Sequence, residues 1–416
     1  MDQDYTDFAE EDDTRLIQAH RALNQGDDAL ALELAEDYLA DFPLNVDALN
    51  LCAVAAGNVG DGAKALALYG KALLLDPDNG AMHYNFGMLL QQMELREAAL
   101  WHLQRALELQ PDFPEIYLSL GNLLDEAGRP AEALPLFTEA LRRAAPNVAD
   151  VYFSQGCALN RLERFAEALD CFDRVLRLQP RSAPAWNGRG YALSGLGKEN
   201  QALKSFRQAA RLAPEMAGFR FNCGLSLCRM GQDDAALRQF DLAWERGRDF
   251  WPALWEKILL LIRLGRLEEA GAALSAVKKG AAKRCEWHFC LGLLRAAGED
   301  WPAALAALDR CLALEPDALY AQKEKGRVLM ALGRLEEALR CFDAVLQLAE
   351  GDPQVDYHRA CVLARQGRPR LAIQALSRAA DGDPGFLQAA AFDHAFDGVR
   401  NLPSFQRLFK MKKAEG

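Results

Sequence analysis

Residues 185–214 read AWNGRGYALSGLGKENQALKSFRQAARLAP, and this stretch decides the fold of the chain. It predicts two short helices joined by a turn that starts at Gly197, with a proline ending the second helix. Gly190 and Ala202 are small enough for the two helix backbones to approach closely, and Phe206 would fill the space around that contact. A helix pair of this size cannot bury its apolar face alone, so it needs neighbouring pairs.

The same pattern recurs along the chain in three columns of residues. Alanines stand every 34 residues, with one step of 35, at Ala31, Ala65, Ala99, Ala133, Ala168, Ala202, Ala236, Ala270, Ala304, Ala338 and Ala372. Twelve positions earlier, all but one residue is small: Ala19, Ala53, Gly87, Gly121, Gly156, Gly190, Gly224, Gly292, Gly326 and Ala360. Prolines end second helices at Pro43, Pro77, Pro111, Pro180, Pro214, Pro316 and Pro384. The chain therefore contains eleven tandem copies of one unit.

This pattern resembles the tetratricopeptide repeat family, whose 34-residue helix-turn-helix unit carries W-x2-L-G-x2-Y, then A-x3-F, then P. The resemblance covers residues 12–386, with Arg189 in place of the usual leucine before the glycine. It implies an all-α fold, a right-handed α-solenoid superhelix with a C-terminal capping helix. Outside the repeats we expect a disordered acidic tail over residues 1–11, and capping helices with a basic tail over residues 387–416.

The eighth repeat departs most from the pattern. Ile258 stands where other repeats have a small residue, Gly271 follows the key alanine, and the boundary at 244–256 lacks the terminal proline. A bend or hinge near 244–256 and a locally repacked repeat both fit these departures.

The end of the chain is rich in residues that can cover the last apolar face. These are Phe386, Phe392, Phe396, Leu402, Phe405, Leu408 and Phe409. Similar endings are found in bacterial members of the family, which favours a bacterial source.

Composition favours helix and argues against several classes of protein. Half of the residues are hydrophobic and 26% are charged, and runs rich in Val, Ile and Thr are missing. Much of the net charge of -11 comes from the acidic first thirteen residues, and no basic face suggests nucleic-acid binding. The start lacks the features of a signal peptide and no apolar stretch is long enough to span a membrane, so we expect a cytoplasmic protein.

The sequence shows no set of residues that points to catalysis. Most of the ten cysteines fall in packing columns, which predicts small core residues rather than disulfides or metal ligands. His83 and His102 could meet across one helix pair, although a packed or solvent-facing role is favoured. Phosphate-binding and nucleophile-elbow motifs are missing. We therefore predict no enzyme activity, no cofactor and no metal site.

The family resemblance places a ligand in the concave groove lined by the first helices. The groove-facing positions are the second, fifth, ninth and twelfth of each repeat, and six of the eleven fifth positions are aromatic. The predicted partner-binding residues are Phe153, Asn187, Tyr191, Phe221, Leu225, Arg229, Trp255, Leu259, Arg263, Phe289, Lys323, Arg327 and Tyr357. The thirteenth position forms an arginine edge at Arg161, Arg229, Arg263 and Arg365.

The groove is most apolar around Trp255, where the main site is predicted. The alternative is that these side chains are buried by tighter winding of the solenoid or by a dimer contact. The nearby apolar residues are Phe221, Leu225, Cys228, Leu259, Ile262, Phe289 and Leu293.

These features suggest a non-catalytic scaffold or adaptor that binds a peptide or helical segment, apolar or amphipathic with acidic flanks. The alternatives are an assembly cochaperone of a bacterial secretion, pilus or envelope complex, and a substrate-recruiting partner of a separate enzyme such as a glycosyltransferase. A clamp for chaperone-tail carboxylates is not expected, because Leu118 stands where the family clamp needs lysine. The acidic tail, with Tyr5 and Phe8, could itself occupy the groove, and a homo-oligomer stays open.

Overall fold

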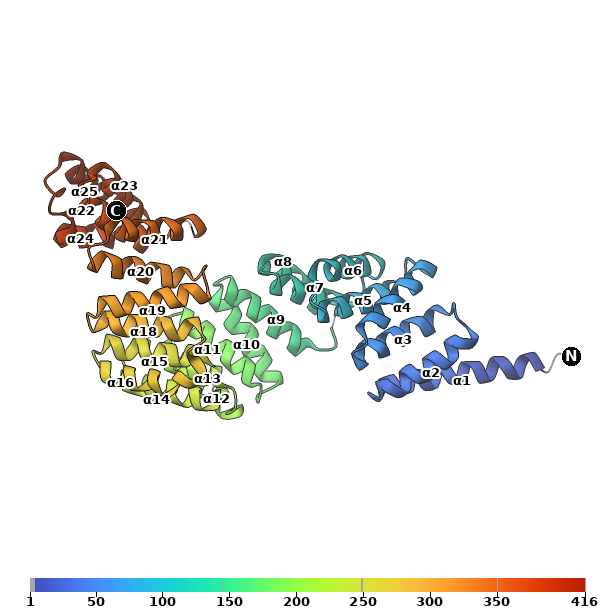
Figure 1. Ribbon diagram of the computed structural model, residues 1–416. Coiled ribbons are helices and arrows are strands. Elements are labelled where there is room, and N and C mark those ends of the chain that lie inside the picture. Colours follow the sequence, from blue (N-terminus) through green and yellow to red (C-terminus); the bar gives the residue numbers. More distant parts are fainter. Residues whose placement is uncertain (1–3, 144, 248–249, 350, 416) are drawn as a thin grey trace. The chain divides into compact units, whose positions relative to one another are not determined.

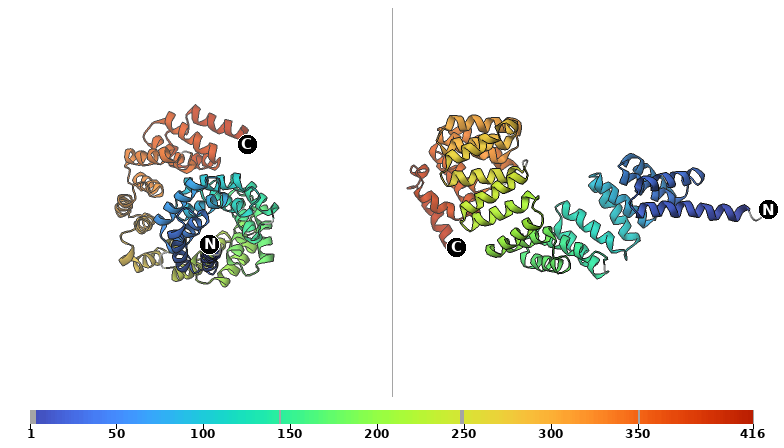
Figure 2. Two further views of the ribbon diagram at one scale, coloured as in Figure 1. Left: turned by 90° about the vertical axis from the view of Figure 1, so that its right-hand side faces the viewer. Right: turned by 90° about the horizontal axis from the view of Figure 1, so that it is seen from below.

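The computed structural model describes residues 4–143, 145–247, 250–349 and 351–415, and every regular element in these ranges is a helix (Figure 1). The chain divides into two compact units, Met1–Pro214 and Glu215–Gly416. In Figure 2 the helices of the first unit wind around a common axis. They are α1 (Asp4–Asn24), α2 (Asp28–Asp41), α3 (Val46–Val59), α4 (Gly62–Leu75), α5 (Gly80–Gln92), α6 (Arg96–Leu109), α7 (Pro114–Glu126), α8 (Pro130–Arg142), α9 (Val148–Arg161), α10 (Phe165–Leu178), α11 (Ala183–Gly195) and α12 (Glu199–Leu212).

The second unit continues the same alternation of first and second helices. Its repeats contain α13 (Ala217–Arg229), α14 (Asp233–Arg246), α15 (Trp251–Arg263), α16 (Leu267–Ala276), α18 (Cys285–Ala297), α19 (Trp301–Leu314), α20 (Leu319–Ala331), α21 (Leu335–Leu348), α22 (Pro353–Arg365) and α23 (Pro369–Gly382). The eighth repeat is irregular, because α16 has 10 residues and the four-residue α17 (Lys278–Ala281) follows it. The predicted all-α solenoid of helix-turn-helix repeats is confirmed.

Close packing of a small residue against an aromatic ring joins the two helices of many repeats. Every alanine of the 34-residue column is 0% exposed. A Cβ atom added to Gly190 would lie 2.6 Å from the ring of Phe206, and one added to Gly224 would lie 2.4 Å from the ring of Phe240. The backbones therefore approach so closely that the first helix has no room for a side chain at this position.

The turn between the two helices of a repeat requires a residue with positive φ. Glycine fills this position in eight repeats, at Gly26, Gly60, Gly128, Gly197, Gly231, Gly265, Gly333 and Gly367. Glu94, Glu163 and Glu299 take the same left-handed conformation in the other three, with φ of 58–60°. A glutamate there is strained relative to glycine, because its Cβ crowds the backbone.

The structure differs from the sequence prediction at the N-terminus. Helix α1 begins at Asp4, so the residues expected to form a disordered tail over 1–11 are largely part of the first helix. Acidic residues suit the first turns of a helix, because its N-terminus carries partial positive charge. Residues 1–3 lie outside the described part of the chain.

The segment 244–256 joins α14 to α15. Helix α14 ends at Arg246 and α15 begins at Trp251, while residues 248 and 249 lie outside the described residues. A bend or hinge in this segment stays a prediction.

Three short elements follow the last repeat: α24 (Gly385–Phe392), the 3-10 helix η1 (His394–Phe396) and α25 (Pro403–Glu415). Phe396 and Phe405 are buried in the same hydrophobic cluster as the last repeat, and further apolar residues pack against it. Those residues are Phe386, Leu402, Leu408 and Phe409. Phe392, which we expected to cover the repeats, is instead 84% exposed.

Cys285 and Cys311 form a disulfide between α18 and α19 in the ninth repeat. This corrects the prediction that the cysteines in packing columns are only small core residues. The two positions lie 26 residues apart in one repeat and face each other across the helix pair, so two cysteines there meet directly. The other eight cysteines are free thiols.

The close approach at Gly190 can be tested with a matched glycine. We expect Gly190→Ala to destabilise the protein by about 1–3 kcal/mol, because the new methyl group must displace the ring of Phe206. Gly70→Ala, in α4, should stabilise it by about 0.5–1 kcal/mol, since no atom lies within 4 Å of its added Cβ. Urea unfolding measures both changes, and equal effects of the two substitutions would contradict the packing described.

The disulfide predicts a thiol count. Protein unfolded in denaturant without reductant should react at eight thiols, and at ten after reduction. Titration with a chromogenic disulfide reagent measures both numbers. Ten reactive thiols before reduction, in protein purified without reductant, would show that Cys285 and Cys311 do not pair.

Candidate functional site

A cavity of about 430 Å³ lies on the first helices of repeats eight to eleven, all in the second unit. Helices α15, α18, α20 and α22 supply most of its walls. The lining residues are Leu259, Ile262, Leu293, Ala296, Ala297, Trp301, Glu324, Arg327, Val328, Met330, Ala331, His358 and Arg365. One residue per turn of each stacked helix faces the same side, so consecutive repeats build one continuous surface.

The cavity combines an aliphatic floor with arginine side chains. Leu259, Ile262 and Leu293 are half-buried, so they leave apolar surface uncovered. Arg327 is 51% exposed and pairs with Glu324 one turn earlier at 2.7 Å. Arg365 Nη1 donates to the backbone oxygen of Met330 at 3.0 Å, which ties α22 to α20.

His358 lies at the wall of the cavity in its neutral form. Burial, and then the positive charges of Arg327 and Lys323, lower the pKa of His358 to about 4. The Nε2 atom of His358 is buried without a hydrogen-bond partner among the described residues. Its ring stacks near Phe342, with 5.8 Å between ring centroids. At neutral pH this imidazole therefore brings no charge to the cavity.

The aromatic residues predicted at the centre of the site pack against one another, with Phe289 buried and Trp255 half-buried. Trp255 stacks on Phe289 with ring centroids 4.7 Å apart, and both rings contact Tyr320 edge-on at 5.3 and 4.8 Å. Phe289 is 4% exposed, so it is not a groove residue. The three rings join α15, α18 and α20, and the alternative expectation of burial within the solenoid holds for Phe289.

Tyr357 is also a packing residue. It is 8% exposed, its Oη donates to Asp393 Oδ2 at 2.8 Å, and its ring stacks on Phe386 with centroids 5.0 Å apart. The C-terminal elements therefore cover this side chain, and the prediction that it lines the groove is wrong. The sequence pattern places Tyr357 on the inner face but does not show that the chain returns to cover it.

The arginine edge connects neighbouring repeats. Arg161 Nη1 donates to the backbone oxygen of Asp125 at 3.0 Å, as Arg365 does to Met330 one repeat apart. Arg263 pairs with Asp233 at 2.9 Å. Cations near the C-terminus of the preceding helix satisfy carbonyl groups that have no partner within that helix. These arginines are therefore already engaged within the chain.

The other predicted residues are spread over both units. Phe153 contacts Phe172 at 5.9 Å, Phe221 contacts Phe250 at 5.4 Å, and Lys323 pairs with Asp352 at 2.7 Å. Tyr191 is 56% exposed. Asn187 and Leu225 are half-buried, and Arg229 is exposed and has an interaction within the chain. Of the thirteen predicted residues, Leu259 and Arg327 line the cavity.

Some cavity residues had no signal in the sequence. Val328 and His358 look like ordinary helix residues, and their place at the cavity depends on how far each repeat is rotated from the next. Within the described residues there is no group of three or more His, Cys, Asp or Glu side chains that could hold a metal ion. The described helices include none long and apolar enough to cross a membrane.

Comparison with known proteins identifies the same type of repeat as the sequence pattern does. Sequence models of the tetratricopeptide repeat match residues 84–149, 153–217 and 292–359. Yeast Tom70 is similar in structure, with a TM-score of 0.56 and 15% identity over 97% of this chain and 99% of that chain. This likeness supports the fold alone.

Two smaller proteins align with part of the chain. YrrB, whose structure is described as that of "a TPR protein with an unusual peptide-binding site", has a TM-score of 0.39 and 27% identity over 45% of this chain and 97% of that chain. PilW, a type IV pilus biogenesis factor, has a TM-score of 0.47 and 20% identity over 50% of this chain and 96% of that chain. No curated protein sequence matches the chain.

The stability of two variants tests whether Trp255 is a packing residue or a free groove residue. Trp255→Ala should lower the free energy of unfolding by about 3 kcal/mol, because it removes a large ring stacked on Phe289. Tyr191→Ala removes an aromatic ring that is 56% exposed and should change stability by about 0.5 kcal/mol or less. Urea unfolding followed by circular dichroism measures both values. If the Trp255 variant were as stable as the Tyr191 variant, Trp255 would not be a packing residue and would again be a candidate for binding a ligand.

Proposed function

Because this chain belongs to the tetratricopeptide repeat family, we propose that it is a non-catalytic scaffold that binds a segment of a partner protein in the cavity on α15, α18, α20 and α22. The observation that carries the proposal is that four consecutive repeats share one cavity with an aliphatic floor and an exposed arginine. Among the described residues that line this cavity there is no serine, threonine or cysteine.

The cavity fits a segment with an aliphatic side chain next to a carboxylate. An aliphatic side chain would remove apolar surface of Leu259, Ile262 and Leu293 from water, which favours binding by roughly 25 cal/mol per Å². A carboxylate of the ligand would pair with Arg327, because exposed ion pairs such as the one with Glu324 contribute little and are easily exchanged.

This assignment moves the predicted site along the groove while keeping its chemistry. The sequence places it at Trp255 and Phe289, whereas these rings pack against each other and against Tyr320. The lining of the cavity begins one turn later, at Leu259. The ligand class proposed from the sequence, apolar or amphipathic with acidic flanks, matches the aliphatic floor and Arg327.

A displayed library of random 12-residue peptides tests the proposal with the full chain. We expect the selected peptides to carry an aliphatic residue within a few positions of Asp or Glu. Arg327→Glu should weaken binding of a selected synthetic peptide by about tenfold or more, because a charge-assisted hydrogen bond contributes about 1.5–3 kcal/mol. Fluorescence anisotropy of a labelled peptide measures the change in Kd.

Arg334→Glu is the matched control. Arg334 forms the same type of pair, with Glu337 one turn away, and is 47% exposed, but it caps the N-terminus of the second helix α21. We expect this variant to bind the peptide as tightly as the unsubstituted chain. Equal weakening by the two substitutions, or selection of peptides without acidic residues, would contradict the proposal.

A further inference from the structure

Three exposed cations run along α12, the second helix of the sixth repeat, and we call them the basic stripe. Lys204, Arg207 and Arg211 are three and four residues apart, so they lie on one side of the helix. In the described part of the chain none of the three forms an ion pair, and Arg211 donates to the neutral amide of Gln208 at 3.2 Å. The one acid of α12, Glu199, lies in its first turn.

The basic stripe departs from the charge pattern of other second helices. The position of Arg207 holds an aspartate in four other repeats, and each aspartate pairs with a cation of the next first helix. These pairs are Asp173–Arg189, Asp241–Lys257, Asp309–Lys325 and Asp343–Arg359, at 2.5–2.7 Å. Because Arg207 reverses the charge at this position, the sixth repeat leaves positive charge exposed where four others neutralise it.

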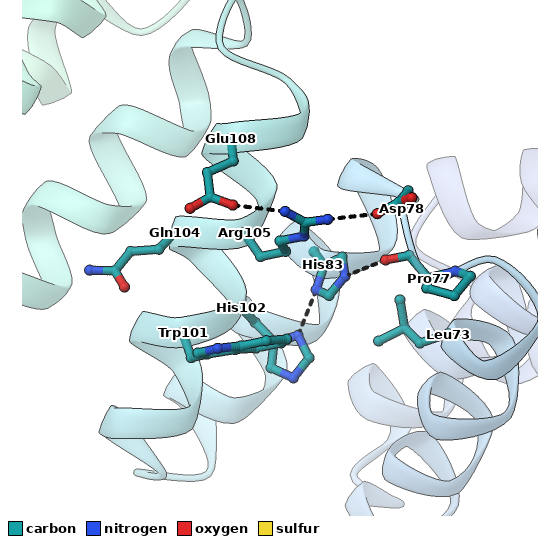
Figure 3. A pocket seen from close by; sticks show the side chains of 9 residues that line it. All are labelled: Leu73, Pro77, Asp78, His83, Trp101, His102, Gln104, Arg105 and Glu108. Atoms are coloured by element: carbon teal, nitrogen blue, oxygen red, sulfur yellow. Dashed lines mark hydrogen bonds and ion pairs between the residues drawn. The ribbon is translucent and has the colours of Figure 1, made fainter.

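Another group of charges in the first unit is already balanced (Figure 3). It lines a hollow of about 570 Å³ between the end of α4 and α6. Arg105 donates to Asp78 at 2.6 Å and to Glu108 at 2.8 Å, so its charge has two partners. His83 and His102 bond to each other in the same hollow, with Nδ1 atoms 2.9 Å apart, so the contact that the sequence left open does occur. Among the described residues that line the hollow, Arg105 is the one Lys or Arg, which leaves no cation there for a charged partner.

The first residues of the chain carry the charge that complements the basic stripe. Residues 1–13 contain seven acids and no Lys or Arg. Asp4, Asp7 and Glu11 repeat the spacing of the stripe, three and then four residues, and α1 is helical from Asp4 onward. Seven residues cover about 10 Å in either helix, so two such helices side by side bring three acids opposite three cations.

Within one chain, α1 and α12 lie too far apart for this contact. Helix α1 has 21 residues, whereas the other first helices of the first unit have 13 or 14, so α1 extends about two turns beyond its repeat. Figure 1 shows that α12 lies at the opposite end of the first unit and that the start of α1 points away from it. An acidic segment that meets the basic stripe must therefore belong to another molecule.

We propose that two copies of the chain associate through the acidic segment of one copy, residues 4–11, and the basic stripe of the other. Each copy supplies one segment and one stripe, so the contact can be made twice within a closed dimer. The chain has a net charge of -11, so two copies repel each other over most of their surfaces, and this local complementarity decides which faces meet. The same net charge disfavours nucleic acids and anionic membranes as partners of the stripe.

Sedimentation velocity of the full chain over a range of concentrations tests the proposal. We expect reversible self-association at about 20 mM NaCl, with a Kd that rises about tenfold or more at about 0.5 M NaCl, because the screening length falls from about 20 Å to about 4 Å. A chain that is monomeric at both salt concentrations, or that associates equally at both, would contradict the proposal.

Reversal of the basic stripe locates the contact. The triple variant Lys204→Glu, Arg207→Glu and Arg211→Glu should be monomeric at low salt, because acids would then face acids. All three side chains are exposed, so the variant should keep its helices, which circular dichroism checks. A folded variant that associates as tightly as the unsubstituted chain would overturn the proposal.

The matched control reverses the other basic cluster of the chain. Lys410→Glu, Lys412→Glu and Lys413→Glu make the same change in net charge near the C-terminus. We expect this variant to associate as the unsubstituted chain does. Equal loss of association in both triple variants would show that the total charge, and not the basic stripe, controls association.

An exchange of charges identifies the two surfaces as partners. A chain with Asp4→Lys, Asp7→Lys and Glu11→Lys should also be monomeric at low salt. Residues 4–11 lie outside the repeats, so this variant tests the contact even if reversal of the stripe disturbs the fold. The chain that carries both sets of reversals should associate again, because each acid once more faces a cation. A folded chain with both sets that stays monomeric would refute the pairing.

Discussion

The contact between a small residue on the first helix and a large side chain on the second, made in most repeats, is the constraint on which the rest of the structure depends. It sets how closely the two backbones approach, as at Gly190 against Phe206 and Gly224 against Phe240. A completely buried alanine in every second helix keeps the same spacing from repeat to repeat. Because the spacing is constant, equivalent side chains of successive repeats lie next to each other, and features such as the shared cavity become possible.

The fold could be predicted from the sequence because its information is local and repeated. Most helix pairs carry their own small residues, turn residue and terminal proline, so the 34-residue period identifies the pairs without any distant contact. The N-terminal helix and the disulfide were missed for different reasons. Acidic composition suggests disorder unless an adjoining helix can extend into it, and a pair of cysteines in packing columns becomes a bond only when both occur in one repeat.

The candidate site was harder to predict than the fold. Position in the repeat tells which way a side chain points, but the neighbour it meets comes from the next repeat. Trp255 packs against Phe289 and Tyr320 of the following repeats and is half-buried. Tyr357 is covered by residues beyond the repeats altogether. The side chains that can bind a ligand are those that contacts between repeats leave accessible, such as Leu259 and Arg327.

The disulfide of the ninth repeat has a mechanical consequence. When an array of helix pairs is pulled from its ends, it lengthens by unravelling pairs, since each repeat contacts mainly its neighbours. Cys285 and Cys311 are 26 residues apart, so the bond withholds about 90 Å of contour length, at about 3.5 Å per residue. Under tension, the segment between Cys285 and Cys311 therefore cannot extend, whereas the other repeats can unfold and lengthen.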